Sequence, residues 1–237
     1  MAIERPPLVN NEIYHIVLRG VDDSEIFRDK DDYYRCVFSL FEFNDEKNVS
    51  LKQRRKERIR AKKYGNKDFS AKRDLLVEIL AFCFMPNHIH LLIRQIKDDG
   101  ITKFMRKFGT GYANYFNKKH NRKGHLFQGR FKAVHIKGDS QLKIVFVYIH
   151  TNPIALIDSK WKEEGIKDSQ KAIKFIENYK WSSYMDYIGK ENFPSVTSRD
   201  FLLDVFDKKE NCREFVNDWI ENKYELSEKI LNKVELE

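Results

Sequence analysis

The stretch Leu75–Ile93 reads LLVEILAFCFMPNHIHLLI and decides the fold of the chain. Two apolar runs flank Met85-Pro86-Asn87, and a Pro-Asn pair between such runs favours a turn, so the stretch predicts a β-hairpin. The second run differs from the first because two histidines, His88 and His90, stand within it.

Outward from this hairpin, the chain alternates between strand-like and helix-like segments. Ile13–Arg19 is rich in β-branched and aromatic residues and predicts a strand, whereas Gly124–His135 is basic, glycine-bearing and without a clear period. Helices are predicted from apolar spacing and capping residues at Asp29–Phe43, at Ile101–Lys119 and from Asp139 or Ser140 to about Asn152. This order indicates an α+β fold, with an antiparallel sheet and helices packed on one side of it, and a ferredoxin-like arrangement fits best.

The composition divides the chain into a main domain, residues 1–190, and a C-terminal extension, residues 191–237, which is amphipathic and helical in pattern. Within the main domain, residues 45–73 form a basic insertion. Its Lys52–Arg73 segment is almost entirely cationic and predicts a surface helix and loop that contacts DNA phosphates.

The overall charge favours a polyanionic partner. The formal net charge is +8 and the isoelectric point about 9.2. No signal peptide or membrane-spanning run is recognisable, and the separated Cys36, Cys83 and Cys212 predict buried reduced thiols, so we expect a cytoplasmic protein without membrane association.

His88 and His90 are candidate metal ligands. Alternate residues of a strand point to the same face, so the two imidazoles share a face of an otherwise apolar strand. A bare His-x-His pair is more often a satisfied surface feature, but polar residues on such a strand need a reason.

Tyr148 and Asn152 are four residues apart in a predicted helix and therefore share one of its faces. Asn152 could complete the metal site while Tyr148 faces the same ion. Among the other tyrosines, Tyr224 is a weak rival because Glu228 follows it at the same spacing. Spacing alone gives Tyr148 a modest advantage over simple packing.

A tyrosine beside a cation suggests phosphoryl transfer. Tyrosine is a weak nucleophile at neutral pH, and a divalent cation on the scissile phosphate offsets the charge that develops during in-line attack. Two imidazoles and one oxygen leave positions open, which favours Mg²⁺ or Mn²⁺ over a structural zinc.

Basic residues alternate with aromatic ones between residues 103 and 132, which is how single strands of nucleic acid are gripped. The candidate DNA-binding cations are Lys103, Arg106, Lys107, Arg122, Lys123, Arg130 and Lys132. A charge run is usually a solvated helix face, but the glycine-rich stretch Gly124–Phe131 favours a functional loop.

Five segments together resemble the single-tyrosine HUH transposases of insertion sequences, and most closely the REP-associated tyrosine transposases. They are Tyr14–Gly20 (YHIVLRG), Met85–Leu92 (MPNHIHLL), Gly124–Phe131 (GHLFQGRF), Tyr148–Pro153 (YIHTNP) and Trp181–Tyr184 (WSSY). The resemblance covers about residues 8–189.

The resemblance implies a bacterial enzyme that binds hairpins in single-stranded DNA and cleaves through a 5′-phosphotyrosine. It also implies catalytic and metal-binding roles for His88 and His90, a nucleophilic role for Tyr148 and a metal ligand in Asn152. Members include monomers and dimers with shared active sites, so a homodimer stays open.

Three other functions compete with this one. A histidine-triad hydrolase would need a third histidine where Leu92 stands. A relaxase or replication initiator shares the chemistry but belongs to longer chains. A domesticated hairpin-DNA-binding protein without transposition activity is the main alternative, and a metal-dependent cleavage assay separates it from an active enzyme.

Overall fold

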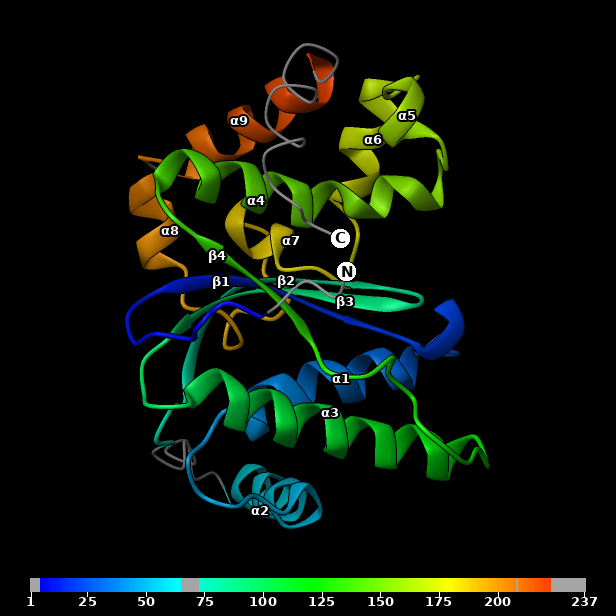
Figure 1. Cartoon of the computed structure of the whole chain (residues 1–237), viewed down its shortest axis with the longest axis vertical. Coiled ribbons are helices and arrows are strands. Elements are labelled where there is room, and N and C mark those ends of the chain that lie inside the picture. Colours follow the sequence, from blue (N-terminus) through cyan, green and yellow to red (C-terminus); the bar gives the residue numbers. More distant parts are fainter. Residues whose placement is uncertain (1–4, 65–72, 208, 223–237) are drawn as a thin grey trace.

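A four-stranded antiparallel sheet forms the centre of the molecule in the computed structural model, which describes residues 5–64, 73–207 and 209–222 (Figure 1). The order across the sheet is β2 (Val77–Met85), β3 (His88–Gln95), β1 (Ile13–Arg19) and β4 (Lys132–Ile136). The predicted hairpin is present as β2 and β3, and β1 pairs with both β3 and β4. The α+β class is confirmed.

Helices cover both faces of this sheet, so the prediction that they lie on one side is wrong. Figure 1 shows α1 (Lys30–Phe43) and α3 (Gly100–Lys119) on one face, with α2 (Leu51–Lys63) beyond them. On the other face lies α4 (Asp139–Thr151), followed by a short 3-10 helix, Asn152–Leu156. Further helices surround α4: α5 (Trp161–Glu164), α6 (Ser169–Ile176), α7 (Tyr184–Tyr187), α8 (Asp200–Val205) and α9 (Lys209–Glu221).

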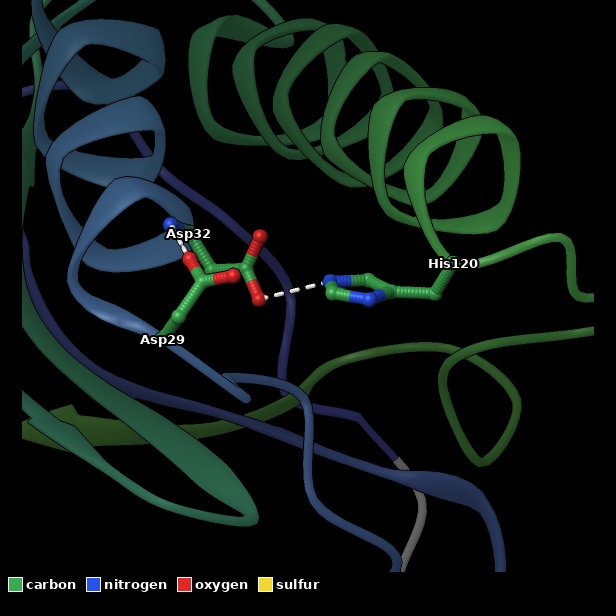
Figure 2. Close-up of side chains that lie close together, drawn as sticks. All are labelled: Asp29, Asp32 and His120. Atoms are coloured by element: carbon green, nitrogen blue, oxygen red, sulfur yellow. Dashed lines mark hydrogen bonds and ion pairs between the residues drawn. The ribbon is translucent and has the colours of Figure 1, made fainter.

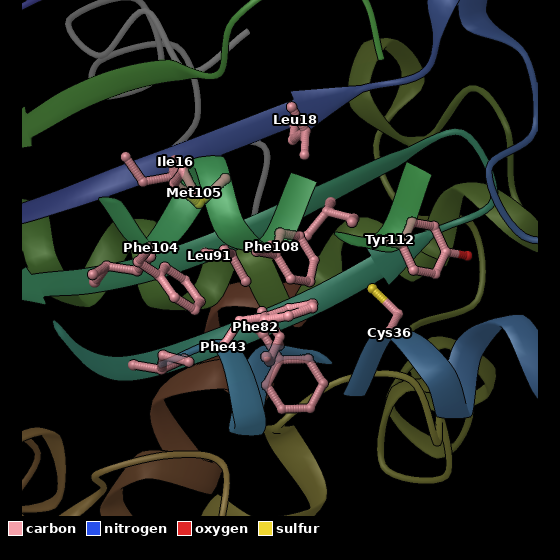
Figure 3. Packing of buried hydrophobic residues seen from close by; sticks show 14 of the residues in the cluster. Ile16, Leu18, Cys36, Phe43, Phe82, Leu91, Phe104, Met105, Phe108 and Tyr112 are labelled. Carbon is pink, nitrogen blue, oxygen red and sulfur yellow. The ribbon is translucent and has the colours of Figure 1, made fainter. Parts of the chain in front are cut away.

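The first face carries an aromatic core. The strand pleat directs Tyr14, Ile16 and Leu18 of β1 towards α1 and α3, and Figure 3 shows the phenylalanines that meet them. Helices α1 and α3 approach closely at Gly111, where a Cβ atom would lie 2.3 Å from the ring of Phe43. The only side-chain polar group that β1 brings to this core is the Tyr14 hydroxyl, which bonds the backbone of Pro7 and Val9.

The second face is closed by α4 and the C-terminal helices. Val145 and Phe146 of α4 share one apolar cluster with Leu202 of α8 and Trp219 of α9. Helix α4 is thus apolar on several sides because it lies between the sheet and other helices. Of the predicted extension, residues 191–237, helices α8 and α9 pack on this core, whereas Phe193 and Val196 pack against the aromatic core of the first face.

The outer edge of β2 is covered by the segment Trp181–Ser183. Phe84 N–H donates to Trp181 O (2.9 Å), and Ser183 N–H donates to Phe82 O (3.0 Å). His150 of α4 bonds the hydroxyl of Ser183 through its Nε2 (2.9 Å), which fixes α4 to this segment. Exposed strand edges invite unwanted pairing, and this segment removes that risk.

Two sequence expectations need comment. Part of Gly124–His135, predicted to be irregular, is strand β4, whose five residues were too few to show a period. The cysteines Cys36, Cys83 and Cys212 are buried free thiols, as predicted. Within the described ranges, no helix is both long and apolar enough to cross a membrane.

Candidate active site

Four side chains from β1, β3 and α4 meet on the second face of the sheet. His15, His88, His90 and Tyr148 make up this group, which we term the histidine cluster. Each is at most 8% exposed. The pleat of β3 places His88 and His90 opposite the aromatic core, because Ile89 and Leu91 enter that core instead.

The two predicted metal ligands lie side by side at the start of β3. Their ring centroids are 4.7 Å apart, with the planes nearly perpendicular at 86°. His88 Nδ1 lies 2.6 Å from Asn87 Oδ1 and donates to it in the assigned amide orientation, which leaves the Nε2 lone pair as the ligand position. Asn87, the last residue of the turn, thus orients His88.

His90 is fully buried, and its electrostatic surroundings keep it neutral. Burial lowers its pKa well below the ordinary histidine value, and His88, His15, Lys162 and Arg19 lower it further. Its Nε2 is buried and has no hydrogen-bond partner among the described residues. A neutral imidazole with such a nitrogen has the form in which histidine binds metal ions.

His15 completes the cluster from the neighbouring strand. A hydrogen bond of 3.0 Å joins its Nε2 to His90 Nδ1, and the two rings stack at 12° with centroids 5.1 Å apart. The sequence analysis gave His15 no role of its own. The signal was available, because a histidine on the apolar strand Ile13–Arg19 is the same kind of anomaly that drew attention to His88 and His90.

Tyr148 projects from α4 onto these histidines. Its ring meets His90 edge-on (centroids 5.6 Å apart, 88°) and His15 similarly (6.0 Å, 80°). Lys162 of α5 donates from Nζ to the Tyr148 hydroxyl (3.2 Å) and lies 5.1 Å from the ring centroid. No sequence pattern predicted Lys162, because it reaches the site from a separate short helix.

Asn152 is buried one turn after Tyr148, where α4 passes into the 3-10 helix. Its Nδ2 donates to Tyr148 O (3.2 Å), which leaves the carboxamide oxygen as the atom that could serve as a ligand. His150, which lies between Tyr148 and Asn152 on α4, bonds Phe146 O and Ser183 Oγ instead.

Of the seven predicted DNA-binding cations, three are engaged in contacts within the protein and four are exposed. Lys103 pairs with Glu46, and Lys107 donates to the backbone carbonyls of residues 45–47, so both hold α3 to the segment after α1. Backbone carbonyls and the Glu46 carboxylate thus already contact their ammonium groups. Arg122, half-buried, donates to Asn117. The other four side chains are exposed: Arg106, Lys123, Arg130 and Lys132.

Arg106 and Arg130 both line a groove of about 630 Å³ between α3 and the segment 124–131. Arg5, which the sequence analysis did not select, also lines it, and its guanidinium lies 3.8 Å from the ring centroid of Phe131. The groove combines cations with apolar rings, the pairing that suits a nucleic-acid strand.

A second group of potential metal ligands, Asp29, Asp32 and His120, lies on the other side of the sheet, between α1 and the end of α3 (Figure 2). We term it the aspartate cluster. Asp29 caps α1 by accepting from Asp32 N–H (3.1 Å), and His120 Nε2 lies 2.8 Å from Asp32 Oδ2. Lys119 Nζ contacts Asp29 Oδ1 (2.6 Å) and Asp32 Oδ1 (2.9 Å). An ammonium group therefore already balances these carboxylates.

Residues 50–152 match the family model described as IS200-like transposase. The matched segment includes the turn and strand that bear His88 and His90, together with the whole of α4 and Asn152. This part of the chain is an IS200-like transposase domain. No curated protein sequence is significantly similar to the chain.

Several solved structures resemble the fold. A REP-associated tyrosine transposase bound to a REP hairpin is 15% identical, with 84% of this chain and 93% of that chain covered and a TM-score of 0.49. A candidate transposase from Deinococcus radiodurans is 15% identical over 62% and 95% of the two chains, with a TM-score of 0.32. The tRNA(His) guanylyltransferase of Saccharomyces cerevisiae is 11% identical over 75% and 76%, with a TM-score of 0.35. At these scores the resemblances carry no argument about function.

Proposed function

We propose that this chain, which carries an IS200-like transposase domain, cleaves and rejoins single-stranded DNA through a 5′-phosphotyrosine on Tyr148. The observation that carries the proposal is the position of Tyr148. Its ring contacts His90 and His15, and its hydroxyl accepts from Lys162. The βαββαβ order, with strands arranged β2-β3-β1-β4, supports a ferredoxin-like assignment for the core.

The histidine cluster fits a divalent cation, Mg²⁺ or Mn²⁺. His90 offers a buried Nε2 that has no hydrogen-bond partner among the described residues, and the hydrogen bond between His88 Nδ1 and Asn87 makes Nε2 the nitrogen of His88 that we propose as a ligand. We propose these two nitrogens and the carboxamide oxygen of Asn152 as the protein ligands. When bound, the ion supplies charge neutralisation and alignment for the scissile phosphate.

Tyr148 would act as the nucleophile. Its oxygen releases its proton to solvent and forms a bond to phosphorus while the bond from phosphorus to the 3′ oxygen breaks. The leaving oxygen takes up a proton from solvent and becomes a 3′-hydroxyl. Lys162 holds the phenolic oxygen with a charged donor, which favours the developing tyrosinate over the neutral phenol. Attack by a terminal 3′-hydroxyl on the phosphotyrosine reverses the step and rejoins a strand.

The DNA partner would be a single strand or a hairpin. Net charge of +8 supports a polyanionic partner, and the groove beside Arg5, Arg106 and Arg130 offers both cations and rings. Tyr148 contacts His90 within one chain, so the proposed site needs no second copy. A homodimer and a shared site are not required by this arrangement.

Covalent capture of DNA tests the proposal. Single-stranded DNA from the flanks of the gene, labelled and incubated with Mn²⁺, should yield a protein-linked band with the wild type and none with Tyr148→Phe. The matched control is Tyr34→Phe, because Tyr34 also accepts from a lysine, Lys180 (2.6 Å), but lies on α1. A band that persists in Tyr148→Phe would disprove the assignment; Tyr224, which lies outside the described residues, would be tested next.

The same assay measures the contribution of Lys162. Lys162→Met should slow adduct formation by about tenfold, because a charge-assisted hydrogen bond is worth about 1.5 kcal/mol or more. Lys180→Met should leave the rate unchanged. The alternative function, a domesticated hairpin-binding protein without transposition activity, predicts DNA binding by the wild type with no adduct at all.

A further inference from the structure

His15 makes a hydrogen bond that an apolar residue filling the same space could not make. It lies on β1, the strand next to β3, and is fully buried on the face that bears His90. Its Nε2 lies 3.0 Å from His90 Nδ1, so the two nitrogens share one hydrogen bond. An apolar residue at this position would fill the space but leave His90 Nδ1 without this partner.

The hydrogen bond can exist in two forms, and they have opposite consequences for His90. When His15 donates, His90 accepts at Nδ1 and carries its own proton on Nε2, which blocks that nitrogen as a ligand. When His90 donates from Nδ1–H, its Nε2 keeps a free lone pair. The proton between the two rings therefore decides whether His90 can bind a cation.

The surroundings of His90 Nε2 distinguish these forms. This atom is buried without a hydrogen-bond partner among the described residues, so a proton there would have no acceptor. A lone pair there is satisfied as soon as a cation binds. His88 has a comparable arrangement, since Asn87 Oδ1 accepts from its Nδ1 and so places the ring proton on that nitrogen.

We propose that His15 is a positioning residue that accepts the hydrogen bond from His90 Nδ1–H and so holds His90 in the tautomer whose Nε2 binds a divalent cation. The proposal rests on the function proposed above and adds to it a residue outside the matched segment 50–152. Residues that hydrogen-bond a ligating histidine without touching the metal orient that histidine and change metal affinity by about 10- to 100-fold.

Side-chain nitrogen NMR on the metal-free, ¹⁵N-histidine-labelled full chain reads the tautomer directly. We expect the proton of His90 on Nδ1. A proton on Nε2 would overturn the proposal, whatever any variant does. This readout needs neither substitution nor activity.

Mn²⁺ binding, followed by electron paramagnetic resonance, gives the second readout. His15→Phe keeps a ring but removes the acceptor, and it should weaken Mn²⁺ binding by about 10- to 100-fold. His15→Gln offers a carboxamide oxygen at a similar reach and should restore binding to within a few-fold of the wild type. Equal affinity in wild type and His15→Phe would overturn the proposal, as would equal losses in the Phe and Gln variants.

His150→Phe serves as the matched control, because His150 is also fully buried but lies on α4 and bonds Ser183 Oγ and Phe146 O. Its Mn²⁺ affinity should equal that of the wild type. Should His15→Phe fail to fold, the wild-type tautomer and the Gln variant decide the question. A wild type that binds Mn²⁺ in a His15-dependent way but forms no DNA adduct would support this inference and refute the proposed function.

Discussion

The histidine cluster and the aspartate cluster both bring together side chains that bind metal ions in other proteins, yet they differ in charge balance. In the aspartate cluster, Lys119 contacts both carboxylates, and Arg28 N–H and His120 bond Asp32 as well. In the histidine cluster, His90 Nε2 is buried without a hydrogen-bond partner among the described residues.

The comparison shows that the presence of metal-binding residue types is a weaker sign of a metal site than a buried ligand atom without a hydrogen-bond partner. Carboxylates are good ligands for hard cations, but an ammonium group from the protein satisfies those of the aspartate cluster. Neutral imidazoles attract no such internal cation. A buried lone pair beside a tyrosine therefore favours the histidine cluster over the group of acids as the proposed metal site.

The largest expected effect comes from removing the ligands of the histidine cluster. His88→Ala combined with His90→Ala should reduce adduct formation by more than about a hundredfold, since even outer-shell partners contribute 10- to 100-fold. DNA binding, measured by gel shift, should largely survive because the cations lie elsewhere. The control, Asp29→Asn with His120→Gln, should leave the adduct unchanged; a matching loss there would remove the distinction between the clusters.

The aspartate cluster should instead govern stability. Asp32→Ala removes a fully buried carboxylate that three groups bond, and it should lower the free energy of unfolding by about 3 kcal/mol. Urea unfolding measures the change. Asp31→Ala, at the exposed neighbouring position, should change stability by less than about 0.5 kcal/mol. Similar values for both variants would show that the network is not structural.

The contribution of Asp32 should also depend on pH. Burial alone would raise the pKa of Asp32, but hydrogen bonds from Lys119, Arg28 N–H and His120 outweigh burial and lower it. A carboxyl group with a lowered folded pKa stabilises the protein above its unfolded pKa, about 3.9, and this stability is lost as pH falls through the folded value. The difference between wild type and Asp32→Ala should therefore shrink below about pH 4 and stay constant near neutrality.

Helix α2 contains cations that form ion pairs and cations that do not. Replacing the second kind should have the smallest effect. Arg54 and Arg58 pair with the buried Glu42, so they anchor the helix and are not free for DNA, contrary to the prediction for the whole segment. Lys56 and Arg60 are exposed, with no ion pair among the described residues. Changing both to Gln should reduce the slope of log affinity against log salt by about 1.4, at about 0.7 per contact.

An unchanged slope would show that α2 is only a solvated surface helix. Figure 1 places α2 beyond α1 and α3, on the side of the sheet away from α4, so no effect on adduct formation is expected at saturating DNA. The rest of the predicted segment, residues 65–72, lies outside the described residues.

Local sequence patterns predicted the hairpin, the shared face of His88 and His90, and the position of Tyr148 on a helix. These features depend on periods of two and of about four residues, which neighbouring residues determine. Helix α4 was predicted, but all helices were expected on one side of the sheet, although the run IVFVYI of α4 is apolar on several sides. An all-round apolar helix signals burial between two layers, and that signal was present.

Contacts between distant segments could not be predicted in the same way. His15 meets His90 only because β1 lies beside β3, and Lys162 meets Tyr148 only because α5 returns to the end of α4. The paired state of Lys103 and Lys107 likewise depends on the segment after α1. Each is a consequence of tertiary structure, about which spacing along the chain says nothing.

The central place of β1 in the sheet has a consequence for the order of events during synthesis. β1 is the first strand to leave the ribosome, yet both of its partners, β3 and β4, are made much later. Until then its apolar sequence has two unpaired edges, a state prone to association with other chains. The sheet, and with it the histidine cluster, therefore closes only after β4 has emerged.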